Sequence, residues 1–136
     1  MSTIGHLSAP GLDDLAALAE AAFDSLPPAF RNLCADLLIR VDEFPSDEVF
    51  AEMGLESPFD LLGLYHGVDL GEKSVSDSGA LPDMVFLYRR PILDYWCESG
   101  EELGRLVAHV LIHEIGHHFG LSDEEMEAVE RALHDD

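Results

Sequence analysis

The feature that most constrains the fold of this chain is a stretch near its C-terminus that is apolar on almost every side. Residues 101–119 carry large aliphatic side chains at helical spacing, namely Leu103, Leu106, Val107, Val110, Leu111, Ile112 and Ile115. A helix that is apolar around most of its circumference belongs in the interior of a domain. Gly120 follows and predicts an abrupt end, because glycine readily adopts the positive φ that closes many helices.

The rest of the chain predicts one small domain built around that helix. Its 136 residues fit a single α+β domain over residues 1–136, with residues 1–10 as a loose N-terminal tail. Apolar spacing and helix breakers predict further helices over residues 11–24, 29–33, 46–53 and 123–133.

Three segments predict strands. Alternating and β-branched patterns favour extended structure over residues 36–44, 61–70 and 84–93. The second of these is expected to be bent or bulged at Gly63 and Gly67. Residues 71–83 are polar and rich in glycine and serine, which predicts a loop. Together the elements predict an α+β domain of two or three layers.

The charge balance limits the partners of the chain. Seven Lys+Arg against 28 Asp+Glu give a net charge of −21, so this acidic protein repels phosphate backbones and anionic membranes. Two cysteines, Cys34 and Cys97, form no disulfide framework, and no basic and apolar leader or membrane-spanning run is present in the sequence. We expect a cytoplasmic protein with no nucleic-acid or membrane partner.

The stretch HEIGHHFGLSD, residues 113–123, predicts a metal site. His113 and His117 are four residues apart, so a helix places both imidazoles on one face, where they can bind one ion. Glu114 is rotated by about 100° from His113, which makes it a candidate general base beside the ion. A catalytic zinc usually has three protein ligands, and a turn at Gly120 can bring Asp123 to the same ion. The predicted site is one zinc ion bound by His113, His117 and Asp123.

The third ligand has alternatives. Ser122 and Glu125 match a capping box, and either Ser122 or Asp123 could cap the last helix. If Asp123 is not a ligand, Glu127 or Glu130 from the last helix could replace it.

Two further histidines lie near the motif. His109 falls on the same stripe as His113 and His117, but it is about 12 Å along the axis from His117, so one ion cannot bind all three. We interpret His109 as a supporting or cleft-wall residue. His118 points about 100° away from His117 and is expected to pack or form hydrogen bonds.

The motif resembles the extended signature of the zincin metallopeptidases, with aspartate where metzincins have a third histidine. The whole chain is similar to the bacterial minimal zincin-like metallopeptidase family, less specifically over LLGLYHGV and VFLYRRPI. The resemblance implies a short three- to four-stranded sheet packed on a central active-site helix, with an edge strand that could align a peptide by β-augmentation. It also implies His113, His117 and Asp123 as ligands and Glu114 as the base. Metzincins carry a methionine turn, whereas Met126 lies inside the last predicted helix and is expected to pack in the core.

These observations predict a zinc-dependent metallohydrolase, a peptidase acting on peptides or proteins, in which Glu114 is the base for a metal-activated water. One alternative is a metal-binding interaction or regulatory module with little catalysis. Another is a metal-dependent endoribonuclease, because the bacterial rRNA-maturation enzymes use a related histidine helix, although with a third histidine and without this glutamate. The negative charge disfavours the nuclease. Substrate, natural metal and oligomeric state stay open.

Overall fold

A computed structural model describes residues 8–34, 36–67 and 83–134. The prediction of a loose tail falls mostly on residues before this range, and the predicted polar loop lies outside it except for Asp83. Within the described ranges the chain forms a mixed three-stranded sheet and six helices, which confirms a small α+β domain.

The sheet has its central strand late in the sequence. β3 (Met84–Tyr88) lies between β1 (Leu38–Asp42) and β2 (Gly63–His66), so β1 and β2 are the two edges. β1 runs parallel to β3, with Leu38 opposite Met84. β2 runs antiparallel to β3, with Gly63 opposite Leu87.

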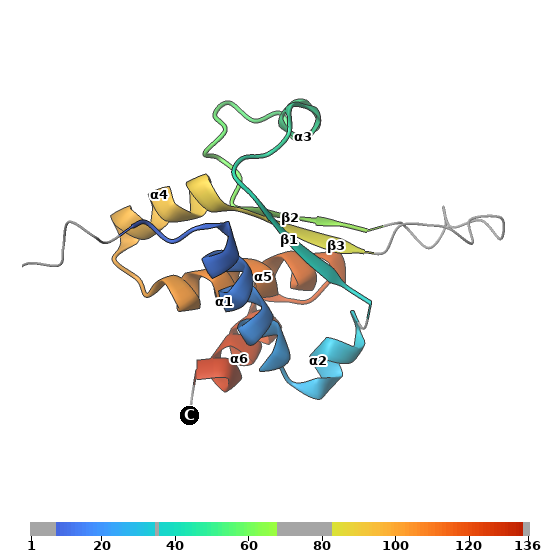
Figure 1. Cartoon of the computed structure of the whole chain (residues 1–136). Coiled ribbons are helices and arrows are strands. Elements are labelled where there is room, and N and C mark those ends of the chain that lie inside the picture. The colour runs from blue at the N-terminus through green and yellow to red at the C-terminus, as the bar shows by residue number, and fades with distance from the viewer. Residues whose placement is uncertain (1–7, 35, 68–82, 135–136) are drawn as a thin grey trace, which may run out of the picture.

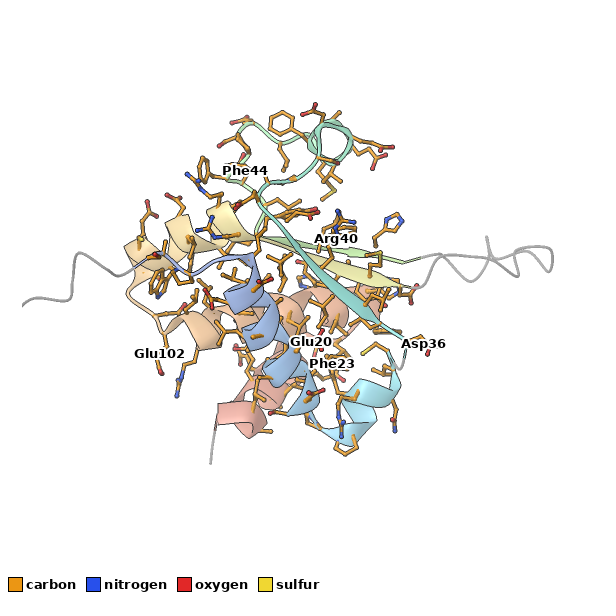
Figure 2. The ribbon with its side chains drawn as sticks, viewed as in Figure 1. Glu20, Phe23, Asp36, Arg40, Phe44 and Glu102 are labelled. Atoms are coloured by element: carbon orange, nitrogen blue, oxygen red, sulfur yellow. The ribbon has the colours of Figure 1, made fainter. Side chains whose placement is uncertain are left out.

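The predicted buried helix is the centre of the domain. α5 (Leu103–His118) packs against β2 and β3 on one side and against α1 (Leu12–Asp24) and α6 (Asp123–His134) on others. Figure 1 shows the sheet above α5, with α1 crossing in front and α6 below. The core includes fully buried side chains from several elements, among them Leu15, Val85, Leu111 and Ile115. Charged residues such as Arg40 and Glu102 are exposed on the outside (Figure 2).

Three shorter helices complete the fold. α2 (Pro28–Asn32) and α3 (Asp47–Glu52) were predicted from the sequence, and Gly54 follows α3 with φ 63°. α4 (Arg89–Ser99) was not predicted.

The prediction of a strand over residues 84–93 is wrong from Arg89 onward. The strand ends at Tyr88, and α4 begins with Pro91 in its first turn. Proline is tolerated there because the first backbone N–H groups of a helix have no intrahelical acceptor. Pro91 and Ile92 are both buried, so this turn is held by packing against the core.

The predicted bulge in β2 is also absent from the described part of that strand. Residues 63–66 pair with β3 in an unbroken register. Gly63 has a different role, since a Cβ at this position would lie 2.7 Å from Val110 Cγ1 of α5 and 3.1 Å from the Phe86 carbonyl oxygen. Glycine therefore allows the edge strand to approach the central helix closely.

Candidate metal centre

The end of α5 has the form that the sequence predicts. The helix runs to His118, and Gly120 follows with φ 73°. The Gly120 N–H donates to the His117 carbonyl at 3.2 Å, and the Leu121 N–H donates to the Gly116 carbonyl at 2.8 Å. These bonds close the helix and turn the chain directly into α6.

His113 and His117 lie one turn apart on α5. Their ring centroids are 5.9 Å apart with an interplanar angle of 79°. Zn–N bonds of about 2.0–2.1 Å place the centres of two imidazoles on one ion about 5–6 Å apart, so the spacing agrees with a shared ion, which stays a prediction. His117 is exposed and His113 is half-buried, so a substrate could reach the pair from the His117 side.

Glu114 lies on the sheet side of α5. Its carboxylate Oε1 accepts a hydrogen bond from the Tyr65 backbone N–H of β2 at 3.3 Å. Burial raises the pKa of Glu114, while the Tyr65 N–H and the neighbouring His117 act in the opposite direction. A carboxylate with a raised pKa is better suited to accept and return a proton near neutral pH.

Tyr65 and His118 form the wall beside Glu114. Their rings are stacked with centroids 3.9 Å apart, which confirms that His118 packs on its neighbours. The Tyr65 hydroxyl donates to Asp83 Oδ2 at 3.0 Å. The contact of Tyr65 with Glu114 is made by its backbone, and no side-chain pattern in the sequence could have indicated it.

Asp123 is the first residue of α6 and is exposed. Ser122 and Glu125 exchange both bonds of the capping box, since the Glu125 N–H donates to Ser122 Oγ at 3.1 Å and the Ser122 N–H donates to Glu125 Oε1 at 3.0 Å. The capping role therefore belongs to Ser122. Among the described residues, however, His113, His117 and Asp123 do not form a group whose possible ligand atoms all lie within 4.8 Å of one another. Asp123 as the third ligand stays a prediction.

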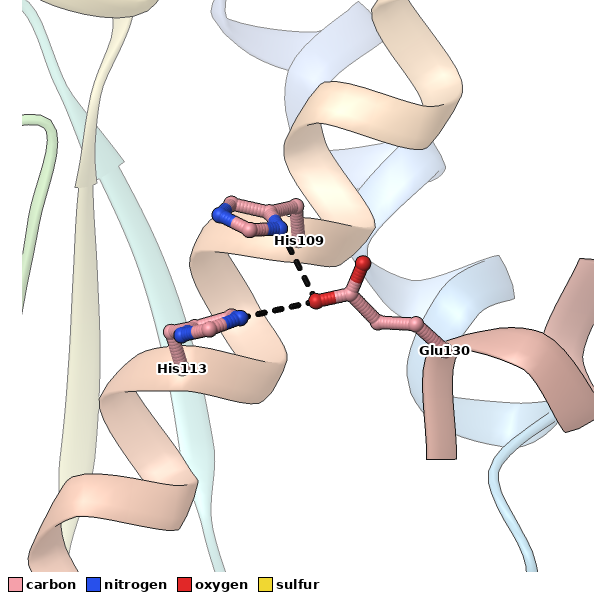
Figure 3. A group of neighbouring side chains, drawn as sticks. All are labelled: His109, His113 and Glu130. Carbon is pink, nitrogen blue, oxygen red and sulfur yellow. Dashed lines mark hydrogen bonds and ion pairs between the residues drawn. The ribbon is translucent and has the colours of Figure 1, made fainter. Parts of the chain in front are cut away.

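A different group does come together. His109, His113 and Glu130 have possible ligand atoms that all lie within 4.8 Å of one another (Figure 3). Glu130 Oε1 is 2.8 Å from His113 Nε2 and 2.8 Å from His109 Nδ1. The sequence showed the stripe that His109 shares with His113, and Glu130 as a substitute ligand, but not that these three residues meet.

Met126 sets how α6 lies on α5. The residue is fully buried, and a Cβ added to Gly116 would lie 2.7 Å from Met126 Cγ. The methionine therefore packs in the core directly against the HEIGHH segment, as predicted. Gly116 and Met126 together allow the two helices to lie close enough for Glu130 to reach the histidines.

The site combines a helix with paired imidazoles, a neighbouring half-buried carboxylate and an adjacent antiparallel strand, a combination that suits a metal-dependent hydrolase. A family model described as zincin-like metallopeptidase matches residues 34–133. The chain belongs to the zincin-like metallopeptidase family. Comparison with curated proteins finds no match.

Family membership indicates a hydrolase that depends on a divalent metal, typically zinc, and acts on peptides or proteins. The donor set agrees, because imidazole nitrogen and carboxylate oxygen are usual zinc ligands. Across the described ranges, none of the helices combines the length and hydrophobicity needed to cross a membrane.

Proposed function

We propose that the protein is a zinc-dependent peptidase with one catalytic ion. His113, His117 and Asp123 are the proposed ligands and Glu114 is the proposed general base. The family match supports the class of reaction, and the closed helix end at Gly120 supports the return of the chain toward the histidines.

The observation that carries this proposal is the placement of Glu114. Its carboxylate is partly withdrawn from water, next to His117 and held by the backbone of β2. A base needs a fixed position, which the contacts with Gly63 and Tyr65 supply, and burial raises the pKa of Glu114 above its ordinary value.

The chemistry divides between the ion and the chain. Zinc, when bound, polarises the scissile carbonyl and makes water more acidic. Glu114 accepts the proton of the attacking water and passes it to the leaving amine. Exposed His117 leaves this side of the helix open to a substrate.

The edge strand gives a means of holding an extended peptide. Within the described ranges β2 pairs with β3 on one side only, and its Tyr65 N–H points to Glu114. A peptide that pairs with this edge by β-augmentation would run past the base, which places its backbone carbonyls near the ion.

The test compares two isosteric substitutions. Glu114→Gln should retain about one zinc per chain, measured by elemental analysis, and lower the cleavage of quenched fluorescent peptides at least about a hundredfold. Glu20→Gln, at an exposed position of α1, is the matched control and should leave both zinc content and cleavage unchanged.

Turnover by Glu114→Gln equal to that of the unchanged protein would remove Glu114 from the reaction. Full zinc occupancy without cleavage of any peptide in a broad library would favour the metal-binding module instead.

A further inference from the structure

The histidines of α5 extend one turn beyond the motif. His109, His113 and His117 are spaced by four residues, so they form one stripe along the helix. α6 follows that stripe, with buried Met126 against Gly116 and Glu130 one turn further along.

Asp123 and Glu130 share one face of α6. They are seven residues apart, which is about two helical turns. Since α6 turns back along α5 after Gly120, its acidic residues lie beside different positions along the length of the stripe. Glu130 reaches the His109 and His113 end, while Asp123 begins the helix near the His117 end.

We propose that His109, His113 and Glu130 form a second site for a zinc-type divalent cation, and that this site competes with the catalytic site for His113. The competition rests on the proposed function, whereas the second site itself rests on the observed cluster. An ion in the second site withdraws His113 from the catalytic set, so the position of one ion determines whether the protein can act.

The geometry of the cluster fits an ion with little movement. Both histidine nitrogens point at the same carboxylate oxygen, each from 2.8 Å (Figure 3). Ligand atoms around a tetrahedral zinc lie about 3.3 Å apart, given bonds of about 2.0–2.1 Å, so a shift of about half an ångström per contact admits the ion. Two imidazoles and a carboxylate leave a fourth position for water.

The two sites exclude each other because of His113. Its Nε2 atom has one lone pair, and this atom is the one that faces Glu130. His109 and His117 cannot both bind the same ion, since eight residues of helix separate them by about 12 Å. The chain therefore binds a single ion, which lies at one end of the stripe or at the other.

Cobalt(II) is the probe for the test, because its visible absorption reports the ligands and their geometry. The His117→Ala variant should still bind about one cobalt per chain, with a spectrum different from that of the unchanged protein. Adding His109→Ala should then weaken cobalt binding at least about tenfold, and adding Glu130→Gln instead should do the same. His66→Ala added to His117→Ala is the control, since His66 is exposed on β2.

The converse variant separates the two proposals. His109→Ala with His117 intact should bind cobalt only at the catalytic end, and peptide cleavage in excess zinc should rise. Loss of all cobalt binding in correctly folded His117→Ala, verified by circular dichroism, would overturn the second site. Cobalt binding unchanged by His117→Ala but abolished by His109→Ala would support the second site and contradict the proposed catalytic ligands.

Discussion

The two ends of the histidine stripe on α5 differ in the contacts and the exposure of their side chains. At the N-terminal end His109, His113 and Glu130 are joined by two contacts of 2.8 Å. At the C-terminal end His117 and Asp123 are both exposed. The end proposed for catalysis is therefore the exposed one, and the Glu130 carboxylate contacts the histidine one turn away from His117.

The largest expected effect comes from the residue that belongs to both ends. His113→Ala should abolish zinc binding at either site and lower peptide cleavage by at least about a thousandfold, because two protein ligands do not retain a catalytic zinc. Isothermal titration with zinc measures the loss, and His66→Ala is the control. Retained stoichiometric zinc in His113→Ala would show that the two ends do not share this ligand.

The packing of Met126 between α5 and α6 gives the next effect. Met126→Ala leaves a cavity beside Gly116 and should lower the free energy of unfolding by about 2–5 kcal/mol, measured by denaturant titration. Glu130 should lose its fixed position, so cobalt binding in the His117→Ala background should weaken as well. Met126→Leu conserves volume better and should cost less than about 1.5 kcal/mol. Equal loss in both variants would contradict this account.

Alkaline pH should affect both ends of the histidine stripe equally, because the group that loses its proton, the Tyr88 phenol, belongs to β3. Burial, with Asp42 and Glu114 nearby, raises the pKa of Tyr88 to about 12. Its phenol is therefore favoured in the neutral form by the fold, and the stability this gives is complete below about pH 10 and is lost as pH rises toward 12.

We expect the free energy of unfolding to fall by on the order of 1–2 kcal/mol over that interval, and Tyr88→Phe to reduce the fall. Tyr95→Phe, at a side chain that is 47% exposed, is the control. A pH profile identical in Tyr88→Phe and the unchanged protein would assign the alkaline loss elsewhere.

The smallest expected effect concerns the exposed end. Ser122→Ala removes the capping box of α6 and should lower the free energy of unfolding by about 1 kcal/mol. Because Asp123 follows directly, zinc affinity at the catalytic end should fall, while cobalt binding in the His117→Ala background should not.

Ser46 is the corresponding cap of α3, and its Oγ accepts from the Val49 N–H at 3.1 Å. Ser46→Ala should lower the free energy of unfolding by a similar amount without changing zinc affinity. Similar zinc affinities in the two variants would show that Asp123 does not depend on this cap.

The sequence predicted α5 well because its signal is local. A run of aliphatic residues at helical spacing and a glycine after it determine both the burial and the end of the helix. The same holds for the capping box at Ser122. By contrast, α4 was missed because the apolar residues of β3 resume after Arg89 and Arg90, and Pro91 marks the end of a strand as readily as the first turn of a helix.

The candidate site was predicted only as far as local geometry reaches. The spacing of His113, Glu114 and His117 follows from one helix. The meeting of Glu130 with His109 depends on how α6 docks, which is decided by Gly116 and Met126 across two helices. A contact between segments with no fixed spacing cannot be obtained from periodicity, so the sequence placed Asp123 first and left Glu127 and Glu130 as substitutes.

The turn at Gly120 has a consequence for how the protein can vary. Only Leu121 and Ser122 separate this left-handed residue from α6, and the Leu121 N–H is bonded back to Gly116. The connection is too short to absorb an extra residue, so an insertion there would rotate α6 by about 100° about its axis. Glu130 would then leave His109 and His113, so the length of this connector, as much as any ligand, is a requirement of the proposed second cation site.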